Sequence, residues 1–125
     1  MTSVEIPYSI TNHGRAVLGS GGVNPVMVSY RWLPEDHDGE AIDGIRNSLP
    51  GFLFPGGSVH GTLVLNTPGR RGRWRLRLSL VQEQIAWFDD LDPGNGVELL
   101  VHVLPASDRA WFARAARRRK TKARA

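Results

Sequence analysis

The stretch RWRLRLSL, residues 73–80, decides the fold of this chain. Trp74, Leu76, Leu78 and Leu80 alternate with arginines and a serine along it. Because successive side chains of a strand point to opposite faces, this alternation predicts a strand with one buried face. A helix would spread the same apolar residues around its axis. We therefore predict a strand over residues 73–80.

The same alternation recurs along most of the chain. Pro7 cannot donate to a ladder, so we expect the first of these strands at a sheet edge. No helical pattern separates the strands, and this excludes parallel βαβ units. We expect Trp32 and Trp74 in the core of the fold. We predict an all-β fold, an immunoglobulin-like antiparallel β-sandwich of about seven strands over residues 1–105. The other expected strands cover residues 4–10, 26–32, 59–65 and 97–103, with a weak one over 41–46 and a continuation over 81–88.

Residues 106–125 differ from the rest in charge. They hold eight of the sixteen Lys and Arg residues and one acid, 8 − 1 = +7, whereas residues 1–105 hold eight bases and eleven acids, 8 − 11 = −3. We predict a basic helix over 108–119 capped by Ser107, fraying towards Ala125, or else a disordered solubilising tail. Such a tail could dock on an acidic partner, on nucleic acid or on an anionic membrane surface. The side chains expected to do so are Arg114, Arg117, Arg118, Arg119, Lys120 and Lys122.

No pattern of a catalytic or metal site is visible in the sequence. The chain has no cysteine, and its four histidines are far apart. Asp89, Asp90 and Asp92 favour either a solvated acidic loop or calcium binding, but the twelve-residue calcium-loop pattern is absent. We therefore predict that the chain is not an enzyme and has no cofactor and no metal.

Two further classes are disfavoured by the distribution of apolar residues. Residues 1–8 lack a basic stretch followed by an apolar run, as a secretory signal has. No apolar stretch approaches the roughly 20 residues that span a bilayer. The expected location is the cytoplasm.

The pair Trp87-Phe88 is the candidate for ligand binding. In a regular strand one of two neighbouring side chains points outwards. If that side chain is Trp87, it could stack on a sugar ring while Glu83 and Asp89 accept hydrogen bonds from the hydroxyls. The alternative is that both rings pack at the end of a strand.

The stretch from Gly72 to Phe88 resembles the final third of β-sandwich accessory domains attached to bacterial glycosyltransferases and methyltransferases of surface-polysaccharide synthesis. The resemblance spans about residues 4–103. The resemblance implies an immunoglobulin-like module without catalysis that helps an enzyme hold a glycan or a partner. The other matching pieces, in order, are Ile10–Gly14, Asn24–Val26, Ser29–Trp32, Leu49-Pro50, Pro55-Gly56 and Thr67-Pro68.

Two functions follow as expectations. The first is a glycan-binding accessory module with Trp87, Glu83 and Asp89 at its site, acting beside a glycosyltransferase or methyltransferase. The second is a protein-interaction adaptor that uses a sheet face or the edge beside Pro7. Nucleic acid or anionic membrane, bound through the tail, is a lesser alternative.

Overall fold

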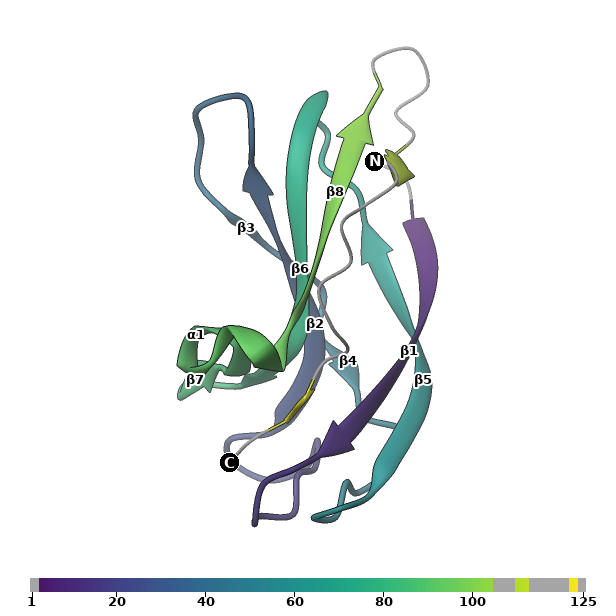
Figure 1. The fold of residues 1–125 in the computed structure, drawn as a ribbon, viewed down its shortest axis with the longest axis vertical. Coiled ribbons are helices and arrows are strands. Elements are labelled where there is room, and N and C mark those ends of the chain that lie inside the picture. The colour runs from purple at the N-terminus through teal and green to yellow at the C-terminus, as the bar shows by residue number, and fades with distance from the viewer. Residues whose placement is uncertain (1–2, 105–109, 113–121, 124–125) are drawn as a thin grey trace.

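The chain forms two β-sheets that face each other, as Figure 1 shows for this computed structural model. The structure describes residues 3–104, 110–112 and 122–123. The long strands are antiparallel to their neighbours, so the predicted all-β class is confirmed. The side chains between the two sheets form the hydrophobic core.

The smaller sheet has the order β10-β1-β5. β1 (Ser3–Asn12) pairs along nearly its whole length with β5 (Ser58–Asn66). Its other edge pairs with β10 (Lys122–Ala123) at Thr11 and Asn12 alone, among the described residues. The edge position expected for Pro7 is therefore confirmed over Ser3–Ile10.

The larger sheet has the order β3-β2-β6-β8-β9, with β4 beside β2 and β7 beside β6. Its central strand is β6, the RWRLRLSL stretch that the sequence marked as a strand. Every apolar residue on one face of this stretch meets an apolar partner on β2, since Leu76 lies opposite Trp32 and Leu80 opposite Val28. The strands are β2 (Val26–Pro34), β3 (Ile42–Asp43), β4 (Asn47–Ser48), β6 (Gly72–Gln82), β7 (Ala86–Trp87), β8 (Val97–Val103) and β9 (Ala110–Phe112).

A short cover lies on the outer face of the larger sheet. After β6 the chain turns at Gln84, whose φ of 69° is in the left-handed region. It returns as β7, then as α1 (Phe88–Leu91) and the 3-10 turn η1 (Pro93–Asn95). The hydroxyl of Ser79 accepts a hydrogen bond from the Asp89 N–H at 3.1 Å and anchors this cover to β6.

Side chains on the inward faces of both sheets form the core. Trp32 is 1% exposed and Trp74 is 3% exposed, which confirms both as core residues. Trp32 lies edge-to-face with Tyr30 and with Trp74, the geometry that aromatic quadrupoles favour. The Trp32 indole N–H donates to the Asn66 carbonyl at 2.9 Å, so the buried ring leaves no polar atom unsatisfied.

One sequence-based expectation about secondary structure is wrong, and two are confirmed only in part. Residues 110–112 were expected in a helix, but they form strand β9 on the free edge of β8. A short isolated helix is marginal in water, whereas an open strand edge offers unpaired backbone groups to a segment containing Trp and Phe. The rest of the predicted 108–119 helix lies outside the described residues. The weak strand over 41–46 shrinks to Ile42–Asp43, and the strand continuation over 81–88 is interrupted at Gln84.

Gly44 gives a test of the packing around Tyr30. A Cβ at Gly44 would overlap the Tyr30 ring, and the Gly44 N–H donates to the Tyr30 carbonyl at 2.8 Å. We expect Gly44→Ala to lower the free energy of unfolding by about 1–3 kcal/mol, because the buried ring has to move. Urea unfolding measures this loss. Gly51→Ala is the matched control, since a Cβ at Gly51 meets nothing within 4 Å. An equal loss in both variants would contradict the close contact.

Candidate functional site

Trp87 is the partly exposed member of the Trp87-Phe88 pair. Phe88 is only 2% exposed and belongs to the core. Trp87 is half-buried on β7, where it lies opposite Val81 of β6. Its ring contacts two guanidinium groups, Arg31 at 4.4 Å and Arg46 at 5.0 Å from the ring centroid. These are cation–π distances, so part of the ring surface is already covered by cations.

Arg31 connects Trp87 to the two aspartates of α1. Its Nη2 donates to both carboxylate oxygens of Asp89, at 2.8 and 2.9 Å. The Asp90 carboxylate accepts from Nη2 at 3.0 Å and from Nη1 at 3.1 Å. Asp89 is 8% exposed, so this is a mostly buried ion pair. Burial acts to lower the pKa of Arg31, but the hydrogen bonds and charges of Asp90 and Asp89 outweigh it and raise that pKa.

Arg46 makes the matching connection to Glu83. Its Nε donates to the Glu83 carboxylate at 2.9 Å, and its Nη1 donates to the Gly44 carbonyl at 3.1 Å. The three residues predicted as a site, Glu83, Trp87 and Asp89, are therefore joined through Arg31 and Arg46. The sequence analysis missed both arginines. The outward position of Arg31 on β2 was a signal, but Asp89 is 58 residues away and no local pattern links the two.

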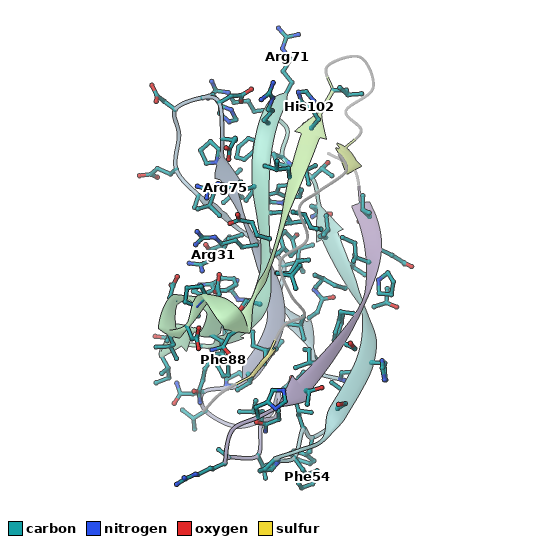
Figure 2. The ribbon with its side chains drawn as sticks, in the orientation of Figure 1. Arg31, Phe54, Arg71, Arg75, Phe88 and His102 are labelled. Carbon is teal, nitrogen blue, oxygen red and sulfur yellow. The ribbon has the colours of Figure 1, made fainter. Side chains whose placement is uncertain are left out.

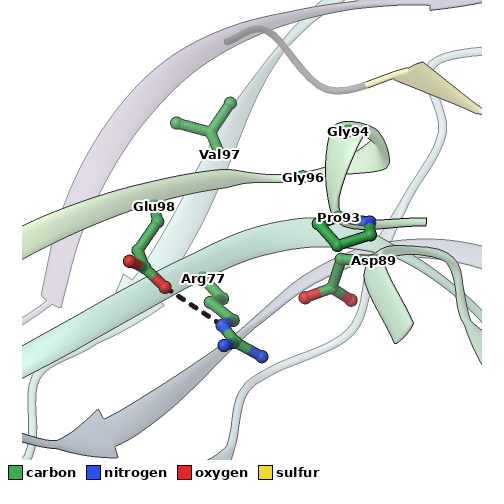
Figure 3. Close-up of a pocket in the computed structure, with 7 residues that line it drawn as sticks. All are labelled: Arg77, Asp89, Pro93, Gly94, Gly96, Val97 and Glu98. Atoms are coloured by element: carbon green, nitrogen blue, oxygen red, sulfur yellow. Dashed lines mark hydrogen bonds and ion pairs between the residues drawn. The ribbon is translucent and has the colours of Figure 1, made fainter. Parts of the chain in front are cut away.

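A cavity of about 290 Å³ opens beside this cluster (Figure 3), and Arg77, Asp89 and Glu98 are its charged lining residues. Arg77 of β6 lies between the carboxylates of Glu98 and Asp89, and its Nε donates to Glu98 at 3.1 Å. Its two terminal nitrogens form no hydrogen bond within the described part of the chain. Of the predicted site residues, Asp89 lines this cavity, while Trp87 and Glu83 do not.

A second cavity, of about 500 Å³, lies at the end of the larger sheet, where Figure 2 labels Arg71 and His102. Asp36 and His37 line it, and their side chains share a hydrogen bond of 2.9 Å. That bond, followed by the bond from the Arg73 N–H, lowers the pKa of the Asp36 carboxyl. These contacts connect the segment after β2 to the start of β6. The Asp36–His37 pair therefore has a structural role that requires no ligand.

A third hollow is an apolar groove of about 570 Å³ between the two sheets. It lies where β1 faces β6 and β8. We call it the β1–β8 groove and define it by Ile6, Tyr8, Ile10, Leu63, Leu78 and Leu99. Its walls carry almost no charge, so its chemistry differs from that of the cavity at Arg77.

Other predicted features are outside these sites. Arg114, Arg117, Arg118, Arg119 and Lys120 lie outside the described residues, and Lys122 falls in β10. Within the described part of the chain, no group of three or more His, Asp or Glu side chains could hold a metal ion. No helix in that part is long and apolar enough to span a membrane.

No protein-family model, curated protein or solved structure matches this chain.

Proposed function

We propose that this chain is a non-catalytic, immunoglobulin-like binding module that recognises neutral sugar residues, and that it serves surface-polysaccharide synthesis in the cytoplasm as an accessory to a glycosyltransferase or methyltransferase. The cavity at Arg77 is the observation that supports this proposal. It combines guanidinium donors with two flanking carboxylates, Asp89 and Glu98. Its volume is close to the lower limit of small-ligand sites, roughly 300 Å³.

The charges in the cavity favour hydroxyl groups over an anion. A hydroxyl both donates and accepts, so neighbouring hydroxyls of one sugar could accept from the Arg77 terminal nitrogens and donate to Glu98. An anionic ligand would be attracted by Arg77 but repelled by two carboxylates. Asp89 is already held by Arg31, and this fixes the shape of the cavity before a ligand enters.

Trp87 has a place in this proposal at the border of the site. Its half-buried ring adjoins Arg31, and Arg31 holds Asp89. The part of the ring that the guanidinium groups leave uncovered could stack on a second sugar residue of a longer glycan. Glu83, bound to Arg46, would then accept from hydroxyls on the same side.

Arg77→Gln tests the proposal. We expect glycan binding by the full-length chain, screened on a glycan array and then titrated calorimetrically, to fall by about tenfold or more, because two charge-assisted donors are lost. Arg73→Gln is the matched control. Arg73 lies on the same face of the same strand, but outside the cavity, and its side chain is 64% exposed. Trp87→Ala should reduce the affinity for longer glycans more than the affinity for single sugars.

Two results would contradict the proposal. One is an absence of binding to any glycan by folded, full-length protein. The other is an equal loss of binding in the Arg73 and Arg77 variants, which would indicate general charge attraction. The array is run at moderate salt, so that the basic residues of 106–125 do not adsorb acidic glycans unspecifically.

The β1–β8 groove favours a second candidate function, the protein-interaction adaptor. Apolar side chains line it, and β1 pairs with β5 alone over residues 3–10 among the described residues. An extended segment of a partner could add to such an edge and place alternate side chains in the groove. The basic residues 114–122 could add contacts with an acidic partner, with nucleic acid or with an anionic membrane. Contacts of that kind weaken steeply with salt, so binding that persists at high salt would exclude the tail from them.

A further inference from the structure

The end of the molecule where β1 ends and β5 begins carries exposed apolar side chains. Phe52 is 70% exposed, Phe54 is 58% exposed and Val17 is 50% exposed. Figure 2 shows Phe54 at this end and Arg71 and His102 at the opposite end. The ring centroids of Phe52 and Phe54 are 6.3 Å apart, so the two rings form one apolar surface. We call Val17, Phe52 and Phe54 the apolar tip.

Backbone hydrogen bonds hold the two loops of the apolar tip together. Leu18 and Leu53 form an isolated antiparallel bridge, with N–H to carbonyl bonds of 3.0 and 2.9 Å. Both leucines are buried. Because successive side chains of an extended backbone point to opposite sides, Val17, Phe52 and Phe54 point away from the core.

Asn12, the last residue of β1, fixes these loops to the smaller sheet. Its side chain is fully buried, and its amide nitrogen donates to the Ala16 carbonyl at 2.8 Å and to the Leu53 carbonyl at 3.1 Å. Its side-chain oxygen accepts from the Gly14 N–H at 2.8 Å. The apolar tip is therefore presented on loops whose backbone is already held in place, and this lowers the entropy cost of binding.

The shape and charge of the apolar tip favour a lipid surface over a protein partner. Its residues line none of the three hollows described above, so the tip offers no pocket for the anchor side chains that dominate protein interfaces. The segments that carry it, residues 13–25 and 49–57, contain no Asp or Glu. Arg15 is the one Lys or Arg residue in them, and it is exposed. A projecting apolar surface beside a cation matches the boundary between acyl chains and anionic headgroups.

We propose that the apolar tip docks the chain on an anionic lipid bilayer. Phe52 and Phe54 enter the boundary between headgroups and acyl chains, and Arg15 pairs with a lipid phosphate. The loop backbone stays among the headgroups, because backbone polar groups without partners are costly in the hydrocarbon region. The residues of the tip are not among those that line the cavity at Arg77, so this proposal is independent of the sugar-binding one.

Vesicle sedimentation of the full-length chain tests the two rings. The vesicles contain phosphatidylcholine and phosphatidylglycerol, and raised salt screens the basic residues of 106–125. We expect Phe52→Ser/Phe54→Ser to lower the partition coefficient by at least about tenfold, because two apolar rings no longer leave water. Leu91→Ser is the matched control. Leu91 is 66% exposed on α1, outside the tip, so its loss should change binding by less than about twofold.

Arg15→Gln tests the charge at physiological salt. It should lower the partition coefficient on the mixed vesicles by about fivefold, the contribution of one Arg near an anionic surface, and should leave binding to pure phosphatidylcholine unchanged. Arg71→Gln is the matched arginine control, because Arg71 lies at the opposite end of the molecule. An equal loss from both substitutions would indicate general charge attraction and would overturn the proposal.

A fluorophore shows which end of the molecule enters the lipid. The chain has no cysteine, so Gly51→Cys and Glu40→Cys can each be labelled at a single position with a polarity-sensitive dye. A Cβ at Gly51 meets nothing within 4 Å, and Glu40 is exposed between β2 and β3. We expect the emission of the dye to shift to shorter wavelength on vesicles at position 51 alone.

Three results would overturn the proposal. The first is a dye shift at both positions or at neither. The second is equal sedimentation of the natural chain and of Phe52→Ser/Phe54→Ser. The third is a concentration-dependent dimer that the double substitution abolishes, without binding to vesicles, which would assign the apolar tip to a second copy of the chain.

Discussion

Arg31→Ala is expected to lower the free energy of unfolding by about 3 kcal/mol, because it leaves the buried Asp89 carboxylate without its partner. Removal of one member of a buried pair costs more than the pair contributes, since the remaining charge is unpaired and largely removed from water. The loss of the cation–π contact with Trp87 adds to the effect. Urea unfolding of the full-length chain, followed by circular dichroism, measures the difference.

The two aspartates that Arg31 contacts supply the control. Asp90→Asn should change stability by less than about 1 kcal/mol, because the Asp90 side chain is 52% exposed and water replaces its contact. Arg31→Leu combined with Asp89→Leu should recover much of the stability that Arg31→Ala loses, since no unpaired charge remains. A large loss in the double variant would show that the pair itself, and not the unpaired charge, stabilises the fold.

Trp32→Ala is expected to lower the free energy of unfolding by about 3–5 kcal/mol. The ring fills the centre of the core at 1% exposure, between Tyr30 and Trp74. Its removal opens a cavity and leaves the Asn66 carbonyl without the indole N–H. The free energy of unfolding of native domains is about 5–15 kcal/mol in total, so we expect the variant to be only marginally folded. The urea midpoint measures the loss.

Trp87→Ala is the matched tryptophan control. Its ring is half-buried over two arginines, so we expect a loss of no more than about 1–2 kcal/mol from the two cation–π contacts. If both tryptophan variants lost the same stability, Trp87 would be a core residue in energetic terms, and its proposed place at a ligand site would be wrong. The intrinsic fluorescence of the two variants reports the same contrast, since a buried indole emits at shorter wavelength.

The fold was predictable from the sequence where one strand face is buried and the other is not. Val26, Val28, Tyr30 and Trp32 follow strict alternation, and all four are buried on the inner face of β2. The prediction was wrong where tertiary contacts outweigh local preference. Residues 110–112 were placed in a helix because Ala113, Ala115 and Ala116 follow them, yet the free edge of β8 is available to them as a ladder partner.

The candidate site was less predictable than the fold. The pairing of Asp89 with Arg31 depends on a contact across 58 residues, between β2 and α1. Trp87 of β7 meets the same arginine. The alternation along β2 and β6 indicated that Arg31 and the arginines of β6 point outwards, but not which acids they meet. Nothing in the local pattern around Arg77 predicted its cavity, because Asp89 and Glu98 reach it from two later elements.

The pairing of β1 with β5 has a consequence during synthesis of the chain. The strands are joined by contacts between residues 47 and 63 positions apart, from Thr11–Ser58 to Ser3–Asn66. A ribosome adds about 5–20 residues per second, so β1 waits roughly 3–12 s for its partner to be made. During that time β1 is an unpaired apolar strand. Pro7 at its centre removes one backbone donor and hinders pairing with a neighbouring nascent chain, which protects the β1 segment until β5 has been made.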